Sequence, residues 1–253
     1  MLMPHLGESR TVMKARHAFL APDGHVRTTL PGWHKTSIIM LISPQMGARF
    51  QQYLAEMEAG GKAKSAEGGL ERFIFVLEGE ITIDIDGKNI PLSHYDYAFL
   101  PAHSYHSIRA NKASKLNVFE RRYIPLAGAG TPTVVTGNEK ELVGEVFMGD
   151  PKLICRKLLP DNPAFDIAVN TMSFEPGVPL PFVETHVMEH GMLMLEGAGI
   201  YRLEQDWYPI REGDNLWMGP YCPQWFACIG KTSAKYLLYK ENNRDPFVHA
   251  KES

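Results

Sequence analysis

The sequence predicts an all-β protein made of two tandem jelly-roll β-barrels, with few short helices. Three observations lead to this prediction. Many short apolar or alternating segments are bounded by Gly, Pro, Asn and Asp, segments with a 3.6-residue hydrophobic period are scarce, and an internal repeat recurs at a constant spacing of 118 residues. A chain of 253 residues is long enough for one large domain or two small ones.

The expected strands begin with residues 73–77 (FIFVL), a continuous apolar run. Residues 81–86 (ITIDID) alternate apolar with polar side chains and lead into the hairpin dipeptide Asp86-Gly87. Further short strands are expected at residues 97–100, 116–119, 191–195, 199–203, 215–218 and 236–239. Only residues 48–59 and 138–146 are expected to form short helices or helical turns.

The internal repeat predicts the domain organisation. The tripeptide LEG at residues 77–79 recurs at residues 195–197, and three further residues recur in the same register without a gap: Glu71 as Glu189, Pro91 as Pro209 and Asp96 as Asp214. We therefore expect an N-terminal module with an N-terminal extension over residues 1–130 and a C-terminal module over residues 131–253. The boundary should fall in residues 125–137, where Gly, Ala, Thr and Pro cluster.

Composition indicates what type of partner the protein binds and in which cellular compartment it is located. The 26 Lys and Arg residues against 29 Asp and Glu residues give a net charge of −3, which argues against nucleic acid or an anionic membrane and favours a small-molecule partner. The three cysteines are too scattered for a disulfide framework or a Cys-x2-Cys zinc site. Residues 1–10 (MLMPHLGESR) lack the apolar core of a secretory signal, so a cytoplasmic location is expected.

Metal-type donors gather in residues 184–190 (ETHVMEH). If this segment is a strand, Glu184, His186 and His190 project to one face and Glu189 to the other. One carboxylate with two imidazoles suits a divalent transition metal that keeps open coordination positions. The alternative is that these histidines are hydrogen-bonded bystanders on an exposed strand.

The spacing of glycines around these donors resembles the two motifs of the cupin superfamily. The arrangement is Gly177, Glu184-x-His186-x3-His190-x6-Gly197, then Gly213-x5-Gly219 and Gln224. Both modules fit, so the chain resembles a bicupin. In the usual cupin the first motif supplies two histidines and a glutamate and the second another histidine, whereas here the order of donor types is permuted. The positions 118 residues earlier hold Ala66, Gly68, Arg72 and His106, so we expect a metal-free, structural N-terminal module.

The permuted donor set resembles the (S)-ureidoglycine aminohydrolase family of bicupins, which acts in allantoin degradation and purine catabolism. Residues 20–26 (LAPDGHV), 121–125 (RRYIP), 184–191 (ETHVMEHG) and 240–245 (KENNRD) carry the resemblance. It implies a manganese enzyme and homo-oligomer that converts (S)-ureidoglycine and water to (S)-ureidoglycolate and ammonia. The implied metal ligands are Glu184, His186, His190 and Gln224. The implied substrate contacts are Glu184, Gln224, Tyr236, Lys240 and Tyr201, with Glu184 and Lys240 as catalytic residues.

The residue types agree with these implications but leave alternatives. The amide oxygen of Gln224 is a harder donor than imidazole and suits Mn(II), and Tyr236 and Lys240 share one face of a late strand. Lys240 as a solvated strand-end lysine, and Tyr236 and Tyr201 as barrel-wall aromatics, are the plain alternatives. For the whole protein, the rival functions are a metal-dependent dioxygenase and a non-enzymatic bicupin that binds a small metabolite.

Overall fold

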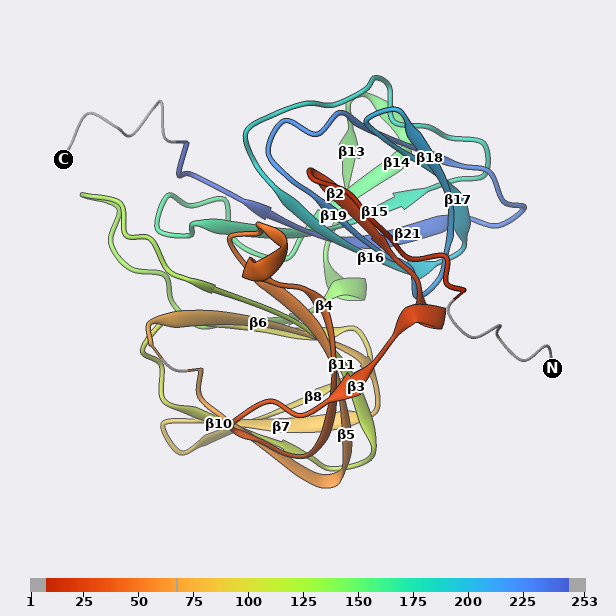
Figure 1. The fold of residues 1–253 in the computed structure, drawn as a ribbon. Coiled ribbons are helices and arrows are strands. Elements are labelled where there is room, and N and C mark those ends of the chain that lie inside the picture. Colours follow the sequence, from red (N-terminus) through yellow and green to blue (C-terminus); the bar gives the residue numbers. More distant parts are fainter. Residues whose placement is uncertain (1–7, 67, 246–253) are drawn as a thin grey trace. The chain divides into compact units, whose positions relative to one another are not determined.

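The computed structural model describes residues 8–66 and 68–245, so the outer ends of both predicted modules lie outside the described residues. The described chain is built from strands and three short 3-10 turns, with no α-helix among these residues (Figure 1). The all-β prediction is confirmed. No described helix is long and apolar enough to cross a membrane.

The chain divides into two compact units, each with its own core. The C-terminal unit contains described residues 8–25, 143–160 and 167–245, and its eight-stranded sheet has the order β1-β2-β19-β16-β21-β15-β14-β13. A three-stranded sheet, β18-β17-β20, completes it. Its elements are β1 (Val12–Met13), β2 (His17–Leu20), a 3-10 turn (Pro22–Gly24), β13 (Glu145–Phe147), β14 (Asp150–Lys157), β15 (Ile167–Phe174), β16 (His190–Glu196), β17 (Ala198–Leu203), β18 (Asp206–Arg211), β19 (Asn215–Met218), β20 (Gln224–Cys228) and β21 (Ala234–Glu241).

The N-terminal unit contains residues 26–142 and 161–166 and is formed by one ten-stranded sheet. Eight of its strands follow the order β12-β9-β6-β11-β5-β10-β7-β8, and β4 joins β5 and β3 beside this path. Its elements are β3 (Arg27–Thr28), β4 (Trp33–Ile42), a 3-10 turn (Pro44–Met46), β5 (Gln51–Lys64), β6 (Leu70–Glu78), β7 (Glu80–Ile85), β8 (Lys88–Ser93), β9 (Asp96–Leu100), β10 (His106–Ala110), β11 (Ser114–Arg122), β12 (Val135–Asn138) and a 3-10 turn (Glu139–Glu141).

The two units divide the chain differently from the predicted modules. Strand β2 pairs with β19, so residues 8–25 belong to the C-terminal unit, because the buried side chains of Ala18 and Phe19 complete that sheet. At the other end, β12 pairs with β9 and extends the N-terminal unit to Leu142. Both differences depend on pairing between segments far apart in the sequence, which no local pattern encodes.

The internal repeat is visible strand by strand. Strands β6, β7 and β8 end at residues 78, 85 and 93, and β16, β17 and β18 end 118 residues later. Each LEG tripeptide ends in a glycine at positive φ, 85° at Gly79 and 75° at Gly197. A Cβ at either glycine would lie 2.3 Å from a backbone oxygen, so only glycine fits. The Asp86-Gly87 hairpin also forms, with φ of 52° and 81°.

The expected helix over residues 48–59 is wrong, because this segment enters the long strand β5. Strand β5 pairs with β4 on one side and with β11 and β10 along the other. These partners satisfy the backbone N–H and C=O groups of the segment within the sheet, which a local sequence pattern does not reveal. The expected helical turn over residues 138–146 is reduced to the 3-10 turn Glu139–Glu141 between two strands.

Candidate functional site

The segment 184–190 does not form the strand that the sequence predicts. Glu184 makes an isolated bridge with Gln224, residues 185–189 are irregular, and β16 begins at His190. The bridge consists of two backbone hydrogen bonds, from Glu184 N to Gln224 O at 2.8 Å and from Gln224 N to Glu184 O at 2.9 Å. The donors are therefore placed by a cross-link to β20 rather than by strand alternation. Glu189 lies apart from them, and its carboxylate accepts a hydrogen bond from Trp217 Nε1 at 3.2 Å.

The two histidines face each other at the start of β16. Nε2 of His190 lies 3.1 Å from Nε2 of His186, and the side-chain nitrogen of Gln224 lies 3.0 Å from the same His186 atom. Nδ1 of His186 donates to the backbone oxygen of Met188 at 3.0 Å, which leaves a lone pair on Nε2. Burial lowers the pKa of both histidines, and that of His190 lies well below its usual value. Both rings are therefore neutral at neutral pH, the form that binds metals.

The amide of Gln224 links the histidines to Tyr201. The Tyr201 hydroxyl donates to Oε1 of Gln224 at 3.4 Å, and both side chains are buried. Burial raises the pKa of Tyr201 well above its usual value, so its hydroxyl stays neutral and able to donate. Tyr201 therefore fixes the orientation of the Gln224 amide. The two residues lie on different strands, so the sequence around either one does not predict this contact.

Glu184 brings a carboxylate beside Gln224, with which its backbone pairs, and within the electrostatic influence of Lys240. It is half-buried, and burial raises its pKa while the positive charge of Lys240 opposes the rise. Among the described residues, its carboxylate has no hydrogen-bond partner. This carboxylate is available to a ligand.

Lys240 and Tyr236 lie on β21, beside β16. His190 stands opposite Lys240, and Met194 stands opposite Tyr236, so all four side chains face the same side of the sheet. Tyr236 is buried against Phe174 and its ring contributes to the core of the C-terminal unit. Of the seven residues of the predicted site, four make contacts with one another: His186, His190, Gln224 and Tyr201. Glu184 is joined to Gln224 through the backbone, Lys240 stands opposite His190, and Tyr236 lies two inward positions further along β21.

The donors fit an ion by their separations. Two ligand atoms bound at right angles, each about 2.1 Å from an ion, lie about 3.0 Å apart. Nε2 of His190 lies at this spacing from Nε2 of His186. Gln224 presents its amide nitrogen there, so it would bind an ion through Oε1 only after the amide turns over. No three His, Cys, Asp or Glu side chains among the described residues form a metal site by themselves, so an ion here would also need the Gln224 amide.

The equivalent place in the N-terminal unit is occupied by a charge network. Arg72, at the position of His190, donates from Nη1 to Nε2 of His106 at 3.2 Å and from Nε to Glu120 at 2.5 Å. Both members of this ion pair are buried, and the guanidinium also lies over the ring of Trp33 at 5.4 Å. The lone pair of His106 that a metal would need is taken by an arginine N–H.

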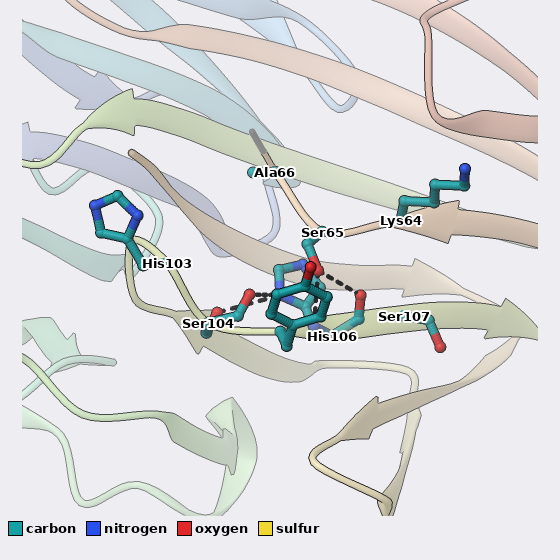
Figure 2. A pocket seen from close by; sticks show the side chains of 8 residues that line it. Lys64, Ser65, Ala66, His103, Ser104, His106 and Ser107 are labelled. Atoms are coloured by element: carbon teal, nitrogen blue, oxygen red, sulfur yellow. Dashed lines mark hydrogen bonds between the residues drawn. The ribbon is translucent and has the colours of Figure 1, made fainter. Parts of the chain in front are cut away.

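Figure 2 shows the surroundings of His106. A cavity of about 460 Å³ lies beside it, lined by Lys64, Ala66 and Tyr105 among others. Nδ1 of His106 is 3.1 Å from the backbone oxygen of Ser104, so both ring nitrogens have partners. Ala66, at the position of Glu184, brings no donor to this cavity.

The sequence did not predict two buried polar residues, one in each unit. Glu120 stands opposite Arg72 as Lys240 stands opposite His190, but a spacing of 118 residues would match Lys240 with Arg122. The loop before β21 is two residues longer than the loop before β11, which changes the spacing to 120. Asn170 on β15 is the other residue, and no motif in the sequence identifies it.

Comparison with known proteins shows which family and which enzymes this chain resembles. A family model described as "Cupin domain" matches residues 53–120, within the N-terminal unit. The (S)-ureidoglycine aminohydrolase of Arabidopsis thaliana is 42% identical over 245 residues, covering 95% of this chain and 80% of that protein. The enzyme of the same name from Escherichia coli K12 is 34% identical, covering 94% and 93%. The crystal structure of protein Ylba from E. coli superimposes with a TM-score of 0.84 at 33% identity, covering 95% of this chain and 97% of that one.

Proposed function

The chain belongs to the (S)-ureidoglycine aminohydrolase family, and we propose that it converts (S)-ureidoglycine and water to (S)-ureidoglycolate and ammonia, with Mn²⁺ bound in the C-terminal unit. The observation that supports the proposal best is the convergence of His186, His190 and the Gln224 amide beside Lys240. Two neutral imidazoles and a side-chain amide next to a cation are the groups that an anionic substrate on a metal would need, which supports the proposal.

The proposed metal ligands are Glu184, His186, His190 and Gln224. Glu184 and Gln224 are held together by two backbone hydrogen bonds, so both stay in position as a pair. Carboxylate and amide oxygens are hard donors and favour Mn²⁺ over softer ions. A divalent ion held by these residues would act as a Lewis acid toward the oxygen and nitrogen atoms attached to the reacting carbon.

The proposed substrate contacts surround this donor set. Ureidoglycine carries a carboxylate, an amine and a ureido group on one carbon, and Lys240 is the cation positioned to pair with the carboxylate. Tyr201 and Tyr236 are buried, neutral phenols on the inner side of the same unit. Together with Gln224 they close the site around a small polar molecule and fix its orientation.

The reaction exchanges one bond at the carbon that bears all three groups. The C–N bond to the amine breaks, a C–O bond from water forms, and the proton released by water leaves on ammonia. Glu184 is the group within the site whose carboxylate has no partner among the described residues, so it is suited to hold the amine and carry that proton. We assign the catalytic roles to Glu184 and Lys240.

The experiment that tests this function uses freshly prepared (S)-ureidoglycine and protein reloaded with Mn²⁺, Fe²⁺ or Zn²⁺. We expect stoichiometric ammonia, (S)-configured ureidoglycolate by circular dichroism, and the highest rate with Mn²⁺. Oxygen consumption in place of ammonia release would identify a dioxygenase. Tight substrate binding without turnover would identify a metabolite-binding bicupin.

We further propose a homo-oligomer located in the cytoplasm. The three cysteines are free and buried, which suits a reducing compartment. Trp207 is half-exposed beside Trp225, with ring centroids 5.8 Å apart, and is a candidate for a subunit contact. A sedimentation mass of a single chain at working concentration would contradict the oligomer.

A further inference from the structure

We propose that Asn170 recognises the ureido group of the substrate, an assignment that rests on the proposed function. Asn170 lies in the middle of β15 and is 8% exposed. Within residues 8–66 and 68–245, its side chain has no hydrogen-bond partner. Its amide atoms are not sealed from solvent, so a small molecule that enters the unit can reach them.

The strand register directs Asn170 to the inner side of the C-terminal unit. It stands opposite Leu238 on β21, which in turn stands opposite Met192 on β16. Opposite residues on neighbouring strands share a face, and Met192 belongs to the core of this unit with Leu238 packed against it. Figure 1 shows β15, β21 and β16 side by side. Asn170 is therefore on the same face as Lys240 and Tyr236.

Asn170 and Lys240 are spaced so that their side chains could bind the two ends of one small molecule. Lys240 stands opposite Ala168, so Asn170 is its diagonal neighbour across the strand pair. Diagonal neighbours are about 7–8 Å apart at the backbone, a distance that long side chains bridge together with a small ligand. Because Ala168 has only a methyl side chain, no bulky group fills the space between them.

The chemistry of the amide matches a ureido group. The side chain of Asn offers one carbonyl acceptor and two N–H donors. A ureido group presents the complementary edge, an N–H beside a C=O, so the two form a pair of hydrogen bonds in one plane, as Asn does with the adenine edge. Lys240 binds the carboxylate at one end of the substrate, and Asn170 binds the ureido group at the other.

A purely structural role does not account for this residue. The amide makes no hydrogen bond within the described chain, so it adds no polar contact that would hold the fold together. The neighbouring inward positions on the same strand hold apolar residues, Ala168 and Met172. The amide is therefore available to a partner that is not part of the described chain.

The test compares Asn170→Leu with Ser173→Ala, a matched control on the same strand. Ser173 stands opposite Lys235, on the other face of β15. Two ligands without a leaving amine serve as probes: N-carbamoylglycine, which has a ureido group, and N-acetylglycine, in which a methyl replaces the terminal NH2. We expect the wild type to bind N-carbamoylglycine about tenfold or more tightly than N-acetylglycine, and Asn170→Leu to lose this preference.

Substrate kinetics and metal analysis complete the test. Asn170→Leu should raise KM for (S)-ureidoglycine about tenfold to a hundredfold, with metal content and the unfolding midpoint close to wild type. Ser173→Ala should behave as wild type in every measurement. If Asn170→Leu keeps both KM and the preference for N-carbamoylglycine, the assignment is wrong. If wild type itself turns over no ureidoglycine yet discriminates the two probes, the proposed function fails while the ureido site stands.

Discussion

Arg72 forms a buried ion pair with Glu120 at the place in the N-terminal unit that His190 and Lys240 occupy in the C-terminal unit. In one unit the fixed cation is a guanidinium bound to a carboxylate. In the other, neutral imidazoles lie next to a lysine. The same strand register thus supports a self-contained charge pair in one unit and a set of donors for an external ion in the other.

The Arg72–Glu120 pair predicts a stability effect. Arg72→Met leaves the Glu120 carboxylate buried without its partner, and breaking a buried pair in this way costs about 3–5 kcal/mol. The double variant Arg72→Met/Glu120→Leu should recover most of the loss, because no uncompensated charge remains. Urea unfolding of the two variants measures this. Arg27→Met, which removes an exposed pair with Glu56, is the control and should change little.

The occupied lone pair of His106 predicts one metal per chain, held by the C-terminal unit. Arg72 donates to the nitrogen that an ion would need, and Ala66 and Gly68 bring no donors. Metal analysis of protein reloaded with Mn²⁺ should give one equivalent. Two equivalents bound with similar strength would contradict the metal-free N-terminal unit.

His186→Ala should abolish metal binding and activity without unfolding the protein. Loss of an outer-shell partner alone costs about 10–100-fold in metal affinity, so removal of a ligand should cost more than about a hundredfold. Each unit keeps its own hydrophobic core. His34→Ala, at an exposed position, is the control. An unfolded His186→Ala protein, judged by circular dichroism, would mean that the ion is structural.

Lys240→Met should separate substrate binding from metal binding. Removal of one partner of a buried charged contact costs about 2–5 kcal/mol, which corresponds to a loss of about thirtyfold to several thousandfold in kcat/KM. Metal content should stay at the wild-type value, since a charged lysine is not a ligand. Lys235→Met, an outward-facing lysine on the same strand, should change activity little. Near-normal turnover by Lys240→Met would place the carboxylate contact elsewhere.

His106 predicts a pH dependence of stability. Burial, and then the positive charge of Arg72, lowers the pKa of His106 from 6.5 to about 4. The unfolded chain therefore binds a proton that the folded chain does not, so stability is present above about pH 6.5 and falls as the pH decreases toward 4. Between about pH 7.5 and pH 5 this amounts to about 2 kcal/mol. His106→Gln, which cannot titrate, should lose less stability than wild type over this range in urea unfolding; an equal loss in both proteins would contradict the pKa.

The sequence by itself determined the features that depend on residues close together in the chain. The alternation in residues 81–86 with Asp86-Gly87, and the glycine that ends each LEG tripeptide, specify strands and turns through side-chain period and backbone sterics. The constant spacing of 118 residues identified two related units. The possible metal ligands at residues 184, 186, 190 and 224 could also be recognised, because residue type and spacing are read directly from the sequence.

The tertiary structure decided which residues meet across strands. Glu120, rather than Arg122, corresponds to Lys240 because the loop before β21 is two residues longer than its counterpart, and β2 joins the C-terminal unit because β19 offers an edge. Residues 48–59 become a strand because partners lie on both sides, and Asn170 shares a face with Lys240 only through the register of β15 with β21. Register and pairing arise from contacts between distant segments, which satisfy backbone hydrogen bonds and bury side chains only once the whole sheet is assembled.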